Sequence, residues 1–204
     1  MTAQKYLKRL GGFTLVELLI VIAILAIIAL IVIAAINPIE QANRARDAGM
    51  KADSSQMVSA IDRYFAARME FPWVTSGAVA NNDAFYGFIT AQDINIGICA
   101  ADCNTDGILI TTNELKPEFR NRNFITATSE DFFMYVGKAA EASSSVYACY
   151  IPQARANRDR ACVDETVFTL SAVDGTRIAV PVADCTGAAS TAWTANNWVV
   201  CVPE

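Results

Sequence analysis

The N-terminal part of the chain is dominated by a long apolar pattern. Nineteen residues from Leu18 to Ile36 carry no charged side chain. As a helix they would span about 28 Å, which matches the hydrocarbon thickness of a bilayer. A single carboxylate, Glu17, stands at the start of this run, and three basic residues precede it: Lys5, Lys8 and Arg9. Because basic residues stay on the cytoplasmic side, we expect a membrane span with everything after Ile36 exported.

A second helical pattern follows the span. Apolar residues recur there at steps of one, three and four, which predicts an amphipathic helix that packs on a sheet. Pro72 marks the predicted end of this helix, because the residue before a proline is disfavoured in a helix. The apolar stripe consists of Met57, Val58, Ile61, Tyr64, Phe65 and Met69. The charges predicted to occupy the intervening positions are Arg44, Asp47, Lys51 and Asp62.

Pro38 lies between these two patterns. Inside a helix a proline removes one hydrogen bond and clashes with the preceding turn, at a cost of about 3 kcal/mol. A kink or local break is therefore expected. Two interpretations stay open: a simple bend at the membrane surface, or a hinge used in function.

Short patterns of strand type fill the rest of the chain. They predict an antiparallel sheet, and the amphipathic stem helix is expected to cover one face of it. The predicted fold class is therefore α+β, with the helix packed on one side of the sheet. The expected strands are Phe85–Thr90, Ile94–Cys99, Phe132–Val136, Val146–Ile151, Thr166–Leu170, Arg177–Val182 and Trp198–Val202.

Composition narrows the chemistry of the exported part. All six cysteines lie in it, and their even number fits disulfides in an oxidising compartment. The chain contains no histidine, which removes the usual general base, cysteine–histidine zinc sites and histidine-dependent catalytic triads. We therefore expect no enzyme, because no nucleophile, base and orienting residue converge in the pattern.

The N-terminus differs from an ordinary secretory signal. Its apolar run is too long, and a small pair, Gly11-Gly12, stands before the run instead of after it. The segment from Gly12 to Glu17, GFTLVE, resembles the class III signal of type IV pilins and pseudopilins, which combines a glycine at the cleavage point, a phenylalanine as the new first residue and a glutamate four positions later. The resemblance covers residues 1 to about 69.

That resemblance implies a course of events. A prepilin peptidase would cut after Gly12 and methylate the new amine of Phe13. The subunit would wait in the cytoplasmic membrane with its N-terminus inside and then be lifted by the pilus assembly machinery into an extracellular helical polymer of itself. The implied parts are a leader (1–12), a membrane and filament-core helix (13–36), the amphipathic half of the stem (37–71) and an exported disulfide-containing domain (72–204).

Cleavage offers Glu17 a partner. An ionised group in the membrane is costly, by about 2.5–3.5 kcal/mol on insertion scales, and is therefore a functional candidate. The cationic amine at Phe13 could pair with Glu17 of its own chain or of a neighbouring subunit and so favour correct axial stagger. The alternative is that Glu17 only reaches the membrane interface of a signal-anchored protein.

The cysteine pairing is open, because six cysteines allow fifteen connectivities. Proximity in sequence favours three pairs: Cys99 with Cys103, Cys149 with Cys162, and Cys185 with Cys201. The last pair would resemble the C-terminal disulfide region of many type IV pilins. A cysteine metal site is disfavoured because no C-x-x-C motif occurs.

The segment DCNTDGI resembles the start of an EF-hand-type calcium loop. Asp102, Asn104 and Asp106 alternate before a glycine, and Ile108 could offer its carbonyl. The twelfth position is Asn113, so no bidentate carboxylate stands where the motif needs one. Calcium binding and a plain Asx/Gly turn both stay open.

Three arginines, Arg155, Arg158 and Arg160, form a predicted basic loop. Removing the leader with its three basic residues leaves 13 basic against 21 acidic residues, a net charge of −8. This charge opposes general attraction to phosphates, so we expect a solvated loop and no strong affinity for nucleic acid.

The function favoured by the sequence is a structural subunit of a type IV pilus, for adhesion, motility or DNA uptake. Two alternatives remain: a pseudopilin of a type II secretion system, and a monomeric signal-anchored surface binding module.

Overall fold

The computed structural model describes residues 12–35 and 37–204, and the chain divides between Ile39 and Glu40 into two compact units. The first unit contains the apolar helix α1 (Leu15–Ala35), with its side chains from Leu15 to Ile33 exposed. Among the described residues, one helix segment, Leu15–Ile33, is long and apolar enough to cross a membrane. The predicted leader before Gly12 and the predicted end of the span, Ile36, lie outside the described residues.

Helix α2 (Pro38–Arg68) begins at the proline instead of containing it. Proline is well tolerated at the first position of a helix, where its missing N–H would have no helical partner. The side chain of Asn37 caps the start, since its Oδ1 accepts a hydrogen bond from the N–H of Ile39 at 3.2 Å. The disruption expected at Pro38 is thus a helix start at this residue.

The amphipathic pattern of α2 is largely confirmed. The buried residues of the helix include Met57, Val58, Ile61 and Tyr64. The prediction is wrong at the C-terminal end, because Met69 has a left-handed φ of 59° and the helix stops at Arg68. Pro72 starts a short helix of its own, α3 (Pro72–Thr75). The prediction is also wrong for Asp47, which is buried and not solvent-facing.

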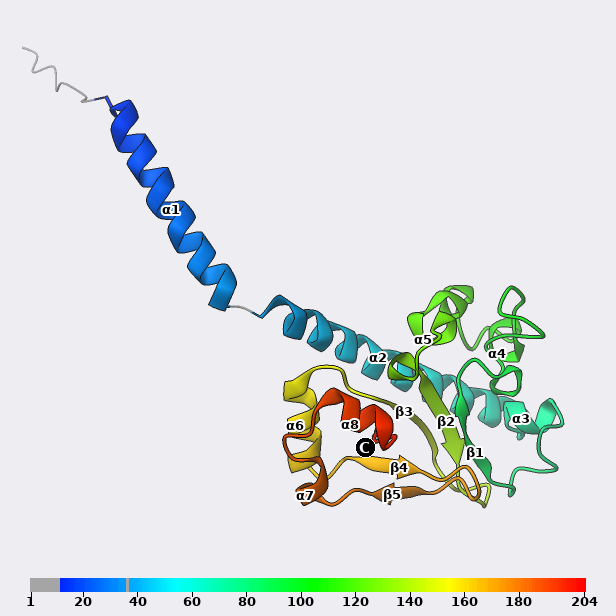
Figure 1. Cartoon of the computed structure of the whole chain (residues 1–204). Helices are drawn as coiled ribbons and strands as arrows, with labels where there is room; N and C mark the ends of the chain where they lie inside the picture. The colour runs from blue at the N-terminus through cyan, green and yellow to red at the C-terminus, as the bar shows by residue number, and fades with distance from the viewer. Residues whose placement is uncertain (1–11, 36) are drawn as a thin grey trace, which may run out of the picture. The chain divides into compact units, whose positions relative to one another are not determined.

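The main sheet has four antiparallel strands in the order β1-β2-β3-β6. Strands β1, β2 and β3 are labelled in Figure 1. Strands β1 to β3 form a meander, and β6 returns beside β3. Their bounds are β1 (Tyr86–Thr90), β2 (Met134–Lys138), β3 (Val146–Tyr150) and β6 (Val200–Val202). The predicted α+β class is confirmed.

Each face of this sheet has its own hydrophobic core. Met134, Val136 and Ala148 pack in one cluster with Met57 and Ile61 of α2, so the stem helix covers this face as expected. The alternate residues of the strands point into a second cluster on the opposite face. A β-bulge in β1 shifts its register between Tyr86 and Ile89.

The second core is closed by C-terminal elements, so the sheet is covered on both faces and not on one side only (Figure 1). It includes the fully buried Trp193 of α8. The covering elements are α6 (Arg155–Val163), the two-stranded sheet of β4 (Phe168–Leu170) and β5 (Arg177–Ala179), α7 (Val182–Cys185) and α8 (Ser190–Ala195).

One predicted strand is wrong. Residues Ile94–Ile96 form a 3-10 helix, η1, because Asp93 accepts a hydrogen bond from the N–H of Asn95 and stabilises a turn. Gly97 then adopts a left-handed φ of 92°, where a Cβ would lie 2.5 Å from the side chain of Ile108. The other predicted strands exist with shifted ends. For example, the strand predicted at Arg177–Val182 ends at Ala179, and Val182 is the first residue of α7.

Short helical segments that the sequence did not indicate fill the connection between β1 and β2. They are α4 (Ile108–Thr111), η2 (Pro117–Asn121), α5 (Asn123–Thr126) and η3 (Glu130–Phe132).

All six cysteines form disulfides, and two of the three predicted pairs are wrong. Cys99 pairs with Cys103 as expected. The other two bridges are Cys149–Cys201 and Cys162–Cys185. The physical reason for the first correction is strand order, since Cys149 of β3 and Cys201 of β6 are direct partners in the sheet register. The second bridge joins α6 to α7; the sequence predicted α6 as a loop, and of α7 it placed only Val182 in a strand.

Candidate functional site

The candidate site lies at the N-terminal end of α1. Residues 12–14 precede the helix in non-helical conformation, and Phe13 is 86% exposed. The peptide bond between Gly12 and Phe13, the predicted cleavage point, is therefore in an accessible segment that has no helix to unwind.

Thr14 and Glu17 are joined by a reciprocal set of hydrogen bonds. The N–H of Glu17 donates to Thr14 Oγ1 at 3.1 Å, and Glu17 Oε2 accepts from the N–H of Thr14 at 2.8 Å and from its hydroxyl at 2.9 Å. This is a capping box, in which both ends of the motif satisfy backbone donors that the helix cannot. The carboxylate also lies near the positive end of the helix dipole.

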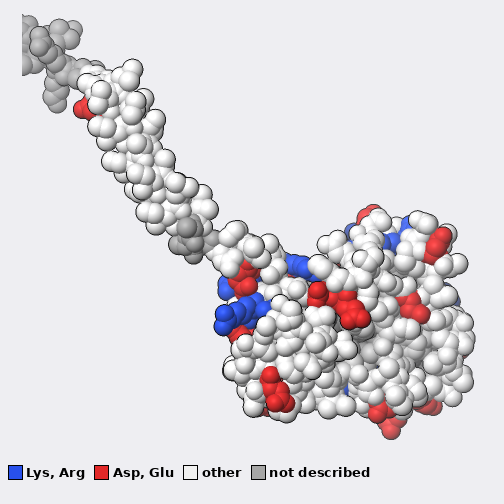
Figure 2. All heavy atoms as spheres, viewed as in Figure 1, with Lys and Arg blue, Asp and Glu red and all other residues white. Residues whose placement is uncertain are grey.

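The capping box places Glu17 next to the predicted new terminus. Its Oε2 is held on the nitrogen of Thr14, the residue directly after Phe13. An amine created at Phe13 would thus arise one residue away from a carboxylate that is already oriented. Apart from one acidic side chain, the surface of α1 in Figure 2 is uncharged, so this carboxylate has no competing cation on its own helix.

Comparison with known families identifies this segment. Residues 7–33 match the model of the prokaryotic N-terminal methylation motif. The chain carries the class III signal of type IV pilins and pseudopilins. This signal implies processing by a prepilin peptidase and assembly in a membrane machinery. No curated protein and no solved structure gave a significant match to the chain.

The class III signal confirms the resemblance drawn from Gly12, Phe13 and Glu17. The motif does not reach Pro38, and a role of this residue in assembly stays a prediction. The sequence missed the part played by Thr14. The signal for it was present, because Thr-x-x-Glu directly before an apolar run is the sequence pattern of a capping box.

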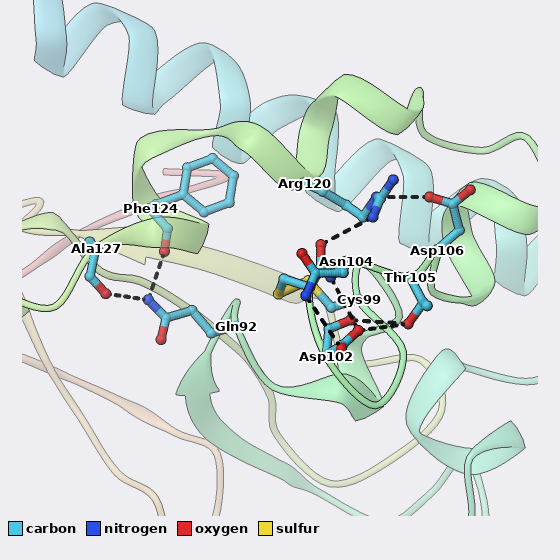
Figure 3. The surroundings of a disulfide bond; sticks show 10 residues. Gln92, Cys99, Asp102, Asn104, Thr105, Asp106, Arg120, Phe124 and Ala127 are labelled. Carbon is cyan, nitrogen blue, oxygen red and sulfur yellow. Dashed lines mark hydrogen bonds and ion pairs between the residues drawn. A yellow bond between two sulfur atoms is a disulfide. The ribbon is translucent and has the colours of Figure 1, made fainter.

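The predicted calcium loop lies beside the Cys99–Cys103 disulfide (Figure 3). Asp102 accepts hydrogen bonds from the N–H of Asn104 at 3.2 Å and from the hydroxyl of Thr105 at 3.1 Å. Hydrogen bonds from the side chains of Asn104 and Thr105 lower the pKa of Asp102. The first part of the loop therefore has the form of an Asx turn.

The other two predicted ligands are engaged elsewhere. Asp106 Oδ1 lies 2.8 Å from Nε of Arg120, whose Nη1 also donates to the carbonyl of Cys103 at 3.1 Å (Figure 3). The carbonyl of Ile108 accepts the N–H of Thr112 at 3.0 Å at the end of α4. Within the described ranges, no group of three or more Asp, Glu, Cys or His side chains could hold a metal ion. These contacts favour the plain Asx turn of the two interpretations, and calcium binding would require Asp106 to leave Arg120.

The predicted basic loop is a helix, α6, and its three arginines differ. Arg158 is buried, and its Nη1 donates to the carbonyls of Pro152 at 3.2 Å and Gln153 at 2.6 Å. Arg155 is exposed and lies 3.6 Å from Asp159. Figure 2 shows acidic side chains next to the basic ones in this region, so the surface is of mixed charge.

Proposed function

We propose that the chain is a structural subunit of a type IV pilus, cut after Gly12, N-methylated at Phe13 and polymerised through α1 into an extracellular filament. The observation that carries this proposal is the capping box: the lone acid of the apolar segment is fixed at the helix start, one residue from the amine that processing creates. A structural and not a catalytic role follows from this proposal.

The exposed apolar surface of α1 supports polymerisation. Side chains from Leu15 to Ile33 are exposed, so they need either lipid or other apolar helices around them. In the membrane lipid tails supply that environment. In a filament, the α1 helices of neighbouring copies would replace the lipid, and the charge of Glu17 would then require a cation in the same apolar surrounding.

The amine at Phe13 of a neighbouring subunit is the cation that this assembly offers. In a low-dielectric interior a paired charge is favourable and an unpaired one is strongly penalised. A helix that docks out of register loses this pairing between subunits, and each charge then has only the partner on its own chain. The pair therefore selects the axial position of each subunit among many that apolar contacts alone would allow.

The capping box permits a test that separates the charge of Glu17 from its helix-capping role. Glutamine also completes a capping box, so Glu17→Gln keeps the hydrogen bond to Thr14 and removes the charge. Glu17→Ala removes both. We expect both variants to be processed and inserted in the membrane, and neither to form fibres visible by electron microscopy. Normal fibres from Glu17→Gln would overturn the pairing mechanism.

The same images distinguish the alternatives. Abundant long fibres with this chain as the main component by mass spectrometry support the pilus. Short fibres that appear only on overproduction, together with a secretion defect on deletion, would support a type II secretion pseudopilin. An intact leader and no fibres would support a monomeric surface-anchored module.

A further inference from the structure

Helix α6 begins without a cap of its own. Its N-cap residue is Ala154, which has no side chain able to accept a hydrogen bond. The first backbone N–H groups of any helix lack partners within that helix, and burying them unpaired is costly. Helix α6 must therefore find acceptors elsewhere in the chain.

Asp47 of α2 supplies the first acceptors. Its Oδ1 accepts the N–H of Gln153 at 2.8 Å, and its Oδ2 accepts the N–H of Ala154 at 2.9 Å. The side chain of Asn157 donates to the same Oδ2 at 2.7 Å. Asp47 is only 3% exposed, so this carboxylate is a buried charge whose stability depends on these three donors.

Glu40, two helical turns earlier, supplies the next acceptors. Its Oε2 accepts the N–H of Arg155 at 3.1 Å, and its Oε1 accepts the N–H of Ala156 at 3.1 Å. Four consecutive backbone N–H groups at the start of α6 thus donate to two carboxylates of α2. We call Glu40 and Asp47 together the carboxylate clamp.

The clamp needs α2 to be helical. Glu40 and Asp47 are seven residues apart, and only in a helix do residues at this spacing lie on one face, about 10 Å apart along the axis. An extended chain would separate them by more than 20 Å, so α6 could not be capped by both. The position at which the chain divides into two compact units, between Ile39 and Glu40, coincides with the first residue of the clamp.

We propose that the carboxylate clamp fixes Glu40 as the N-terminal limit of the second compact unit, Glu40–Glu204, so that any unwinding of the stem helix is confined to the residues before Glu40. The clamp resists unwinding because opening α2 from Pro38 past Asp47, about three turns, leaves the N–H groups of residues 153–156 and a buried carboxylate without these partners. Its use during assembly rests on the function proposed above; its existence does not.

Hydrogen–deuterium exchange of the full-length processed protein in detergent micelles tests the clamp directly. In the wild type, backbone amides from residue 44 onward, in the first turns of α2, and those of residues 153–156 should exchange slowly. Asp47→Asn should increase exchange in both segments by about tenfold or more, because one acceptor oxygen becomes an NH2 donor and the remaining hydrogen bonding loses the negative charge. Residues 57–68 of α2 should change much less.

Two further variants make the result decisive. Glu40→Gln is the milder change, for use if Asp47→Asn does not fold, and it should raise exchange of the α2 amides just after residue 44 and of the amides of residues 155–156. Asp62→Asn removes the same charge from an exposed position of the same helix, and it should leave both segments unchanged. The proposal is overturned if the clamp variants exchange like Asp62→Asn, or if only one of the two segments responds.

A filament structure from cryo-electron microscopy tests whether the clamp limits unwinding of the stem in the assembled state. We expect helical α2 from Glu40 onward, with Asp47 on α6, and any extended chain to lie before Glu40. A stem unwound beyond Asp47 would overturn the clamp as a limit. If the chain forms no filament, the proposed function fails, while the exchange experiment in micelles still decides whether the clamp exists.

Discussion

Replacing Cys149 and Cys201 together by alanine removes the covalent link between β3 and β6. Both cysteines are buried in the second core, and 52 residues separate them in sequence. In the chain-entropy description, a closed loop of this length destabilises the unfolded state by about 4.1 kcal/mol. We therefore expect a large loss in the free energy of unfolding.

The bridge between Cys162 and Cys185 lies inside that loop and reduces the estimate. Its own separation of 23 residues shortens the outer loop from 52 to 29 residues as long as the inner bridge is intact. The same relation then gives about 3.6 kcal/mol. A matched control is the pair Cys99 and Cys103, whose separation of 4 residues gives about 1.9 kcal/mol.

Urea unfolding of the full chain in micelles, followed by tryptophan fluorescence, measures both losses. Trp193 in the second core and Trp73 in the first are fully buried, so their emission should report the loss of packing. The double variant at Cys149 and Cys201 should lose about 1.7 kcal/mol more than the control. Equal losses, or a larger loss in the control, would refute the nested-loop reasoning.

Three other perturbations give independent checks. Hydrogen bonding from the N–H of Ala156 holds the pKa of Glu40 below its ordinary value of 4.5. The ionised Glu40 side chain therefore stabilises the fold above that value, and this stabilisation is lost as the pH falls through the lowered pKa. The difference in urea midpoint between wild type and Glu40→Gln should shrink between about pH 6 and pH 3. Calcium should leave the urea midpoint of the wild type unchanged, because Asp106 is paired with Arg120, and a calcium-dependent rise would show that this pair opens to admit the ion. Lys138→Ala should lower the free energy of unfolding by about 2–4 kcal/mol in the same assay, because the buried ammonium donates to the carbonyls of Ala139 at 2.9 Å and Glu141 at 2.6 Å. A decrease below about 1 kcal/mol would contradict this role.

The helices of the stem could be predicted because their signals are local. The apolar run that became α1 and the stripe of Met57 to Tyr64 in α2 repeat over many residues, so small errors in propensity do not change the result. The N-terminal signal was equally readable, since its chemistry is contained in six consecutive residues. Short elements were harder to predict, because a single side chain can decide their conformation. Residues 94–96 were predicted as part of a strand, but the capping side chain of Asp93 stabilises a 3-10 helix there.

The disulfides and the carboxylate clamp depend on contacts between distant segments. Cys149 and Cys201 meet only because β6 inserts beside β3, and proximity in sequence carries no information about that order. Asp47 was interpreted as a solvent-facing charge. Its spacing of three and ten residues from Met50 and Met57 places it in the buried stripe, and an acid in that position requires donors that sequence alone does not identify.

The most direct test of the account is the mass of the N-terminal peptide of the protein isolated from the cell surface. The account predicts a peptide that begins at Phe13 and carries one methyl group on its amine, with the residues before it absent. A peptide that retains Met1, or an unmodified Phe13 in fully assembled fibres, would contradict it.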